Sequence, residues 1–340
     1  MRTQLTVRTR RLTAVVSLLT ALTTLHAQAS YTNPVIPHDW PDPTVWRTAD
    51  GRFYSMATGG RPLQTSTDLA HWTRTDVEPF DRATWDTLHT FGWHLWAPDV
   101  TTVGRQRIAY VTTYNSAEDA SIVALRETSP GRFRYASVIT RGRTTGILDT
   151  IDPEVVTDPR SGRVWMFFGS IGGIHRIELT ADGLAPLPGT TYEHVAGLTS
   201  AQDPSREHVF EGSYLHRHGR YWYLFVSSGW YNNATYSLRV GRSKRLDGTF
   251  VDRDGRPMSE GHATFVLRSD EGDRFYGPGH CGEIFTDRRG HDYILYHAHD
   301  RQLEGGNPRP TFLQRIRWGR DGWPYVEGGK PAANGQTGRW

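Results

Sequence analysis

The chain has 340 residues, of which 37% are hydrophobic and 12% aromatic, which is enough for one large folded domain. The formal net charge is only +3, and the basic residues form no stripe beyond the N-terminus, which argues against a nucleic-acid-binding protein. Cys281 is the single cysteine, so an internal disulfide is excluded and stability must come from a packed core, in which an inert thiol is expected.

The N-terminus has the order of a secretory signal peptide. A basic stretch, MRTQLTVRTRR, precedes the apolar stretch LTAVVSLLTALTTL, and AQA stands before Ser30. The apolar part is too short for a permanent membrane span. We therefore predict a signal peptide over residues 1–29, a mature domain over residues 30–340, and a secreted or periplasmic protein that has no membrane association after cleavage.

The rest of the chain predicts β-structure with an internal repeat. Short strand-like runs alternate with turns, and no long segment has a helical period. Five units share a polar residue, a short strand, a turn that usually contains Gly and an aromatic strand: PDPTVWRTADGRFYSMATG, APDVTTVGRQRIAYVTTY, IDPEVVTDPRSGRVWMFFGS, FEGSYLHRHGRYWYLFVSS and GHCGEIFTDRRGHDYILYHAH.

The polar residues at the heads of these units are evenly spaced. Asp42, Asp99, Asp152, Glu211 and His280 are 57, 53, 59 and 69 residues apart. A period of about 60 residues, with four short strands in each repeat, is typical of a β-propeller blade. We predict an all-β fold, a single five-bladed β-propeller, in which the head residues converge at one end of the axis. Five unrelated acidic turns in a β-sandwich are the alternative.

Converging carboxylates suit glycoside hydrolysis, in which one acid protonates the leaving oxygen and another carboxylate activates water or attacks the sugar. Asp42, Asp152 and Glu211 are the candidates. Taken singly, Asp42 and Asp152 could equally be Asp-Pro turn caps.

The ordered motifs resemble glycoside hydrolase family 43, from about Asn33 to Val326. They are NPVIPHDWPDPTVW, WAPDV, IDPEVVTD, FEGSYL, VGRSKRLDGTF, GPGHCGEIF, ILYHAHD and GWPYV. The resemblance implies a five-bladed propeller and an inverting enzyme.

By this resemblance Asp42 is the general base, Glu211 is the general acid, and Asp152 orients Glu211 and raises its pKa. Inversion then requires a base-to-acid separation of roughly 6.5–9.5 Å. The resemblance also implies that His280 ligates a hydrated axial cation, often calcium. Calcium prefers oxygen ligands, so water would hold most of the ion, and a structural histidine is the alternative. No organic cofactor is expected.

The arabinanase branch, which cleaves α-1,5-L-arabinofuranosyl linkages in arabinan, is the most similar along its length. The resemblance implies that Trp96 stacks on a sugar, Ser170 binds its hydroxyls and Tyr236 lines the cleft, and Trp230 is a candidate from its position alone. Trp96 could instead be a core ring. The segment GSIGGI departs from the usual pattern, because Ile171 and Gly172 replace two aromatic residues.

Two groups of alternatives stay open at this point. One is a β-xylosidase or α-L-arabinofuranosidase of the same family, and the other is a non-catalytic glycan-binding propeller. A retaining β-fructosidase is disfavoured because its Trp-Met-Asn-Asp-Pro-Asn and Arg-Asp-Pro motifs are absent. We expect a polysaccharide or oligosaccharide substrate and a monomer.

Overall fold

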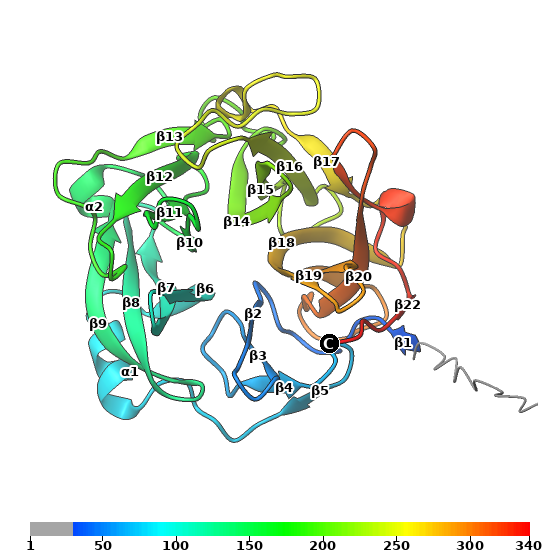
Figure 1. The fold of residues 1–340 in the computed structure, drawn as a ribbon, viewed down its shortest axis with the longest axis horizontal. Helices are drawn as coiled ribbons and strands as arrows, with labels where there is room; N and C mark the ends of the chain where they lie inside the picture. The colour runs from blue at the N-terminus through cyan, green and yellow to red at the C-terminus, as the bar shows by residue number, and fades with distance from the viewer. Residues whose placement is uncertain (1–29) are drawn as a thin grey trace, which may run out of the picture.

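The computed structural model describes residues 30–340, so the predicted signal peptide over residues 1–29 lies outside the described residues. Five four-stranded antiparallel sheets surround a central axis, which confirms the predicted propeller (Figure 1). The first strand of each sheet lies nearest the axis, and the others follow outward in chain order. No helix among the described residues is both long and apolar enough to cross a membrane.

The blades follow one another along the chain. Blade I comprises β2 (Thr44–Arg47), β3 (Phe53–Met56), β4 (Gln64–Ser66) and β5 (Trp72–Arg74). Blade II comprises β6 (His94–Val103), β7 (Gln106–Ser116), β8 (Asp119–Ser129) and β9 (Arg132–Arg141). Blade III comprises β10 (Glu154–Thr157), β11 (Val164–Phe168), β12 (Ile174–Leu179) and β13 (Glu193–Ala196). Blade IV comprises β14 (Phe210–His218), β15 (Tyr221–Ser228), β16 (Ser237–Ser243) and β17 (Thr264–Leu267). Blade V comprises β18 (Phe275–Thr286), β19 (Asp292–Asp300), β20 (Thr311–Trp318) and β21 (Pro324–Val326).

Short helices were not predicted from the sequence. Helix α1 (Arg82–Leu88) joins blades I and II, and the side chain of Asp81 caps it by accepting the N–H of Thr84. Helix α2 (Gly142–Thr145) follows β9, and the 3-10 turns η1 (Met258–Glu260) and η2 (Glu327–Gly329) lie in connections. All are too short to show a helical period in the sequence.

The two ends of the described chain meet and close the ring. Strand β1 (Ser30–Thr32) pairs with β22 (Asn334–Gln336) in a two-stranded sheet. The side chain of Asn33 adds hydrogen bonds to the carbonyls of Leu313 and Ala332 and to the N–H of Leu313. These contacts between the two ends of the chain hold blade V next to blade I.

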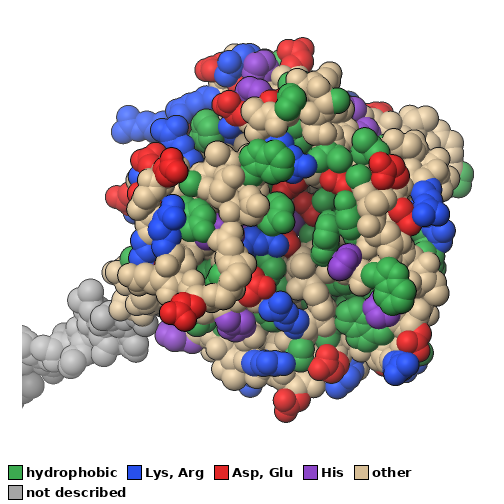
Figure 2. Space-filling model, turned by 180° about the vertical axis from the view of Figure 1, so that it is seen from behind, with side chains coloured by type: hydrophobic (Ala, Val, Ile, Leu, Met, Phe, Trp, Pro, Cys, Tyr) green, Lys and Arg blue, Asp and Glu red, His purple; other side chains and the backbone are tan. Residues whose placement is uncertain are grey.

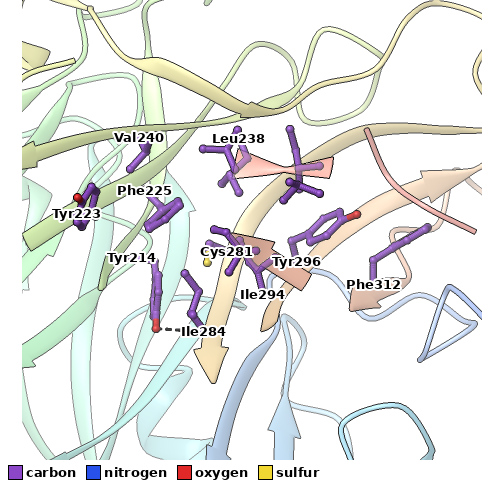
Figure 3. Packing of buried hydrophobic residues seen from close by; sticks show 14 of the residues in the cluster. Tyr214, Tyr223, Phe225, Leu238, Val240, Cys281, Ile284, Ile294, Tyr296 and Phe312 are labelled. Carbon is purple, nitrogen blue, oxygen red and sulfur yellow. Dashed lines mark hydrogen bonds between the residues drawn. The ribbon is translucent and has the colours of Figure 1, made fainter. Parts of the chain in front are cut away.

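Hydrophobic cores fill the spaces between blades. Between blades IV and V, Phe225, Cys281, Ile294 and Phe312 pack in one cluster (Figure 3). Cys281 is buried there, and burial raises its thiol pKa well above the ordinary value, so it is the packed thiol that the sequence indicated.

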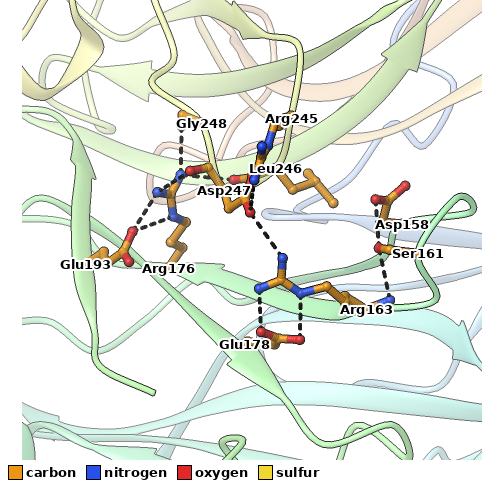
Figure 4. Close-up of polar contacts among 10 residues, drawn as sticks. All are labelled: Asp158, Ser161, Arg163, Arg176, Glu178, Glu193, Arg245, Leu246, Asp247 and Gly248. Atoms are coloured by element: carbon orange, nitrogen blue, oxygen red, sulfur yellow. Dashed lines mark hydrogen bonds and ion pairs between the residues drawn. The ribbon is translucent and has the colours of Figure 1, made fainter. Parts of the chain in front are cut away.

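A polar cluster lies between blades III and IV. The guanidinium of Arg176, which is buried, donates to the carbonyls of Leu246, Asp247 and Gly248 and pairs with Glu193 (Figure 4). The backbone carbonyls of the loop after β16 are thereby satisfied by a side chain from β12.

Candidate active site

A residue in the left-handed region of backbone conformation recurs along the inner strand of each blade, just before β2 and β10 and within β6, β14 and β18. These residues and their φ values are Asp42 (52°), Ala97 (37°), Asp152 (55°), Gly212 (61°) and His280 (51°). Positive φ is uncommon outside glycine and is retained where the surroundings impose it, often at functional sites. The recurrence shows that the repeat is real. It also corrects two positions, because Ala97 rather than Asp99 is the left-handed residue of blade II, and Gly212 rather than Glu211 is that of blade IV.

Asp99 has a different task, two residues deeper along the channel. Its carboxylate accepts the N–H of Val155 in blade III at 2.8 Å. Thr44, Glu154 and Tyr214 stand at the same offset from their left-handed residues, and each accepts one N–H from the next blade. These bonds fix the position of each inner strand along the axis relative to the inner strand of the next blade.

Asp42 is held as a carboxylate. Arg309 donates to its Oδ1 at 3.0 Å, and the Thr58 hydroxyl donates to its Oδ2 at 2.6 Å. Burial opposes the charge, but the guanidinium of Arg309, His280 and the hydrogen bond of His297 together hold the pKa of Asp42 well below its usual value. A carboxyl that stays ionised can act as a base.

Asp152 and Glu211 form a second acidic pair. Asp152 accepts the N–H of Gly212, the residue after Glu211, at 3.0 Å. Burial raises the pKa of Asp152 well above its usual value, and the charges of Glu211 and Asp42 raise it further. Asp152 therefore keeps a proton at a pH at which an isolated carboxyl loses it.

The carboxyl of Glu211 is positioned by two hydroxyls. Ser170 donates to its Oε2 at 2.7 Å, and Tyr236 donates to its Oε1 at 2.8 Å. Ser170 and Tyr236 are nearly fully buried, so they fix the acid from behind. The predicted contacts of these two residues with sugar stay predictions.

A cleft of about 340 Å³ brings the three predicted acids together at the end of the axis. Figure 2 shows acidic side chains deep in a central hollow of the molecule. Trp96 lines the cleft, is half-buried, and stacks on Tyr114 with ring centroids 4.0 Å apart. Its indole therefore forms part of the cleft wall, and one face of the ring can still contact a ligand. Trp230 is exposed but does not line this cleft, and the guanidinium of Arg206 covers its ring at 4.4 Å.

His280 lies below the acids. Its Nδ1 is 3.4 Å from Asp42 Oδ1 and 4.0 Å from Asp152 Oδ2, and its backbone N–H donates to Ser227. Burial lowers its pKa, which favours the neutral imidazole. Within residues 30–340 its Nε2 has no hydrogen-bond partner, so this nitrogen fits a role as one ligand of a cation whose other ligands are water.

Several residues of the site were missed in the sequence. Arg309 comes from the loop between β19 and β20, and His297 from β19 stacks beneath Tyr236. Asp149 also lines the cleft, where burial and the charge of Glu211 raise its pKa to about 6. His297 lies in the motif HAHD, from which a site residue could have been predicted, whereas the sequence around Arg309 contains no motif that indicates a functional residue.

One cleft holds Asp42, which stays ionised, together with Glu211 and Asp152, and the pKa of Asp152 is raised. A base and an acid drawn from such a set of carboxyls are what glycoside hydrolysis requires. The protein is a glycoside hydrolase. The model of the glycosyl hydrolases family 43 matches residues 31–324, and the chain belongs to this family.

Similar proteins act on arabinan. An extracellular exo-α-(1→5)-L-arabinofuranosidase of Cellvibrio japonicus is 29% identical, over 85% of this chain and 86% of its own. An extracellular endo-α-(1→5)-L-arabinanase of Bacillus subtilis is 25% identical, over 93% of this chain and 75% of its own. The solved α-L-arabinanase of Cellvibrio cellulosa with arabinohexaose is 26% identical, with a TM-score of 0.73, over 85% of this chain and 95% of that one.

Proposed function

We propose that the protein is an inverting hydrolase of α-1,5-L-arabinofuranosyl linkages in arabinan. The observation that carries the proposal is that one cleft holds three carboxyls in different environments: Asp42 is kept ionised, the pKa of Asp152 is raised, and Glu211 is positioned by two hydroxyls. The similar proteins named above supply the sugar and the linkage.

In the proposed reaction Asp42 removes a proton from the attacking water, and Glu211 protonates the leaving sugar oxygen. Arg309 and Thr58 keep Asp42 charged and hold its two oxygens in place. The hydroxyls of Ser170 and Tyr236 fix the direction of Glu211. We propose a separation of roughly 6.5–9.5 Å between the two carboxyls, which leaves room for the water.

Asp152 serves the acid without touching the scissile bond. It accepts the Gly212 N–H beside Glu211, and burial together with the charges of Glu211 and Asp42 raises the pKa of Asp152. A hydrated cation, proposed to be calcium, would be held through His280 and would supply positive charge close to the acids. No residue of the chain needs an organic cofactor for these steps.

We propose secretion because the similar enzymes from Cellvibrio japonicus and Bacillus subtilis are named extracellular and residues 1–29 have the signal-peptide pattern. We also propose that the protein acts as a monomer and that, after signal cleavage, it has no membrane or nucleic-acid partner.

The direct test of substrate is to incubate the protein with linear α-1,5-arabinan, with arabinoxylan and xylan in parallel, and to separate early products by size. A ladder of arabino-oligosaccharides identifies internal cleavage, and arabinose or one short oligomer from the start identifies cleavage from an end. Either result supports the proposal. Xylose release, or no product from arabinan, contradicts it.

A further inference from the structure

Three potential metal ligands meet between blades IV and V, away from the cleft. They are His216 and His218 on β14 and Asp292 at the start of β19, and one ligand atom from each lies within 4.8 Å of the others. Glu211 lies near the start of β14, whereas His218 ends it. At about 3.3 Å per residue the seven intervening steps span roughly 20 Å, so this cluster is remote from the catalytic acids.

The strand geometry explains why the two imidazoles lie together. Residues two apart on a strand share a face, and Tyr214, His216 and His218 alternate with Leu215 and Arg217. The hydroxyl of Tyr214 reaches Glu283 on β18, so this face points toward blade V. The pattern His-x-His therefore presents both rings to the blade that supplies Asp292.

The carboxylate of Asp292 is already oriented. Thr286 Oγ1 donates to its Oδ1, and Trp318 Nε1 donates to its Oδ2, both at 2.6 Å. A carboxylate has about four acceptor positions, so both oxygens retain capacity for a metal. Such outer hydrogen bonds hold a ligating group in place and are typical of metal sites.

The imidazoles of His216 and His218 both stack on the ring of Trp318, but their nitrogens have no hydrogen-bond partner among the described residues. The nearest charged contact is His218 Nδ1 to Asp292 Oδ2 at 4.0 Å. The ring of His218 stacks on Trp318 at 3.9 Å with an interplanar angle of 7°, which fixes its plane. The side chain of His218 is 41% exposed, so an ion can enter from solvent.

We propose that His216, His218 and Asp292 form a binding site for Zn²⁺, with water as a fourth ligand. Two imidazoles and a carboxylate are a common ligand set for this ion. Zinc–ligand bonds of about 2.0–2.2 Å in a tetrahedron place ligand atoms roughly 3.3 Å apart, so a movement of about 1 Å closes the site. The bound ion links the inner strand of blade IV to blade V and stabilises their interface.

The test uses the protein purified without a histidine tag and freed of metal by dialysis against a chelator. Zinc chloride is titrated into it by calorimetry. Because the chain has 12 Trp residues, the contribution of Trp318, which stacks on His218, is taken as the fluorescence change in the parent that His218→Gln lacks. We expect one saturable site of micromolar or tighter affinity that is missing from the His218→Gln variant, and an unfolding temperature that rises with zinc only in the parent.

Two further variants sharpen the test. Thr286→Val keeps all three ligands but removes a hydrogen bond to Asp292, and should weaken zinc binding by roughly 10–100-fold. His71→Gln is the matched control, because His71 also contacts a carboxylate, that of Asp68, but in blade I. It should bind zinc like the parent.

Because His218→Gln leaves His280 intact, the difference between variant and parent isolates this site from any cation at the axis. Activity on arabinan confirms that the variant is folded. Zinc binding that His218→Gln and Thr286→Val leave unchanged, or binding only at millimolar concentration, overturns the proposal.

Discussion

Arg309 sets the charge state of the proposed base. Its guanidinium lies 3.0 Å from Asp42 Oδ1, and it is the strongest of the groups that lower the pKa of Asp42. The imidazoles of His280 and His297 also lower the pKa of Asp42, but each does so less than Arg309, and burial lowers their own pKa values, that of His297 to about 3. Replacing Arg309 by Gln should therefore raise the pKa of Asp42.

The size of the shift follows from Coulomb's law. Opposite charges about 4 Å apart interact by about 4 kcal/mol at an effective dielectric constant near 20. At about 1.4 kcal/mol per pH unit this is an upper bound of about 3 units. The side chain of Arg309 is 18% exposed, and solvent weakens the interaction. We therefore expect the acid limb of the pH profile of kcat/KM, which reports the free enzyme, to move upward by about 1–3 units.

Arg309→Lys is the matched control because it keeps the positive charge while it loses the planar geometry of the guanidinium. Its acid limb should stay near that of the parent, even if KM rises because Arg309 lines the cleft. An acid limb that stays in place in Arg309→Gln, with a uniform loss of rate across the profile, would refute the assignment of Asp42 as the base that Arg309 keeps charged.

Three other predictions concern the acid, the channel and the closure of the ring. Glu211→Gln should lower kcat by about 10²–10⁴-fold while binding of arabino-oligosaccharide measured by calorimetry persists, and a parent-like rate would exclude Glu211 as the acid. Burial raises the pKa of Glu283 to about 8 and that of Asp99 to about 7. The unfolded acids ionise near pH 4, so stability falls as pH rises from there to about 7 for Asp99 and to about 8 for Glu283, by up to about 1.4 kcal/mol per unit for each group. Urea unfolding at several pH values should show a flatter dependence in Glu283→Gln, and an unchanged slope would contradict this. Gly282→Ala places a Cβ 2.1 Å from the carbonyl oxygen of Pro43, so urea unfolding should show a loss of about 1–3 kcal/mol, whereas parent-like stability would mean that blades V and I are not closely packed there.

The repeat was sufficient to predict the architecture. Each blade must bury an aromatic strand and end in turns, so these features recur in the sequence once per blade. The five sheets confirm the period predicted from them. The three acids Asp42, Asp152 and Glu211 were also predictable and lie in one cleft. The prediction placed Asp99 at the head of blade II, where the structure has Ala97. A repeat of about 60 residues does not fix a position to within two residues, so the spacing could not distinguish them.

The environment of the base could not be predicted. Arg309 is 267 residues from Asp42 in the chain, and the two meet only because blade V closes on blade I. Ser170 and Tyr236 were predicted as sugar ligands, but the structure adds a role that only three-dimensional packing reveals, since both donate to Glu211. Trp230 was chosen from its position in the sequence alone, and that position does not tell which side of the rim a ring occupies.

The stereochemistry of the product tests the central claim most directly. Arabino-oligosaccharide would be hydrolysed in an NMR tube, and the anomeric proton of the first-formed product followed before mutarotation. If Asp42 activates water opposite Glu211, the β-anomer should appear first from the α-linked substrate. Initial release of the α-anomer would mean retention through a covalent intermediate and would contradict the proposed roles of both carboxyls.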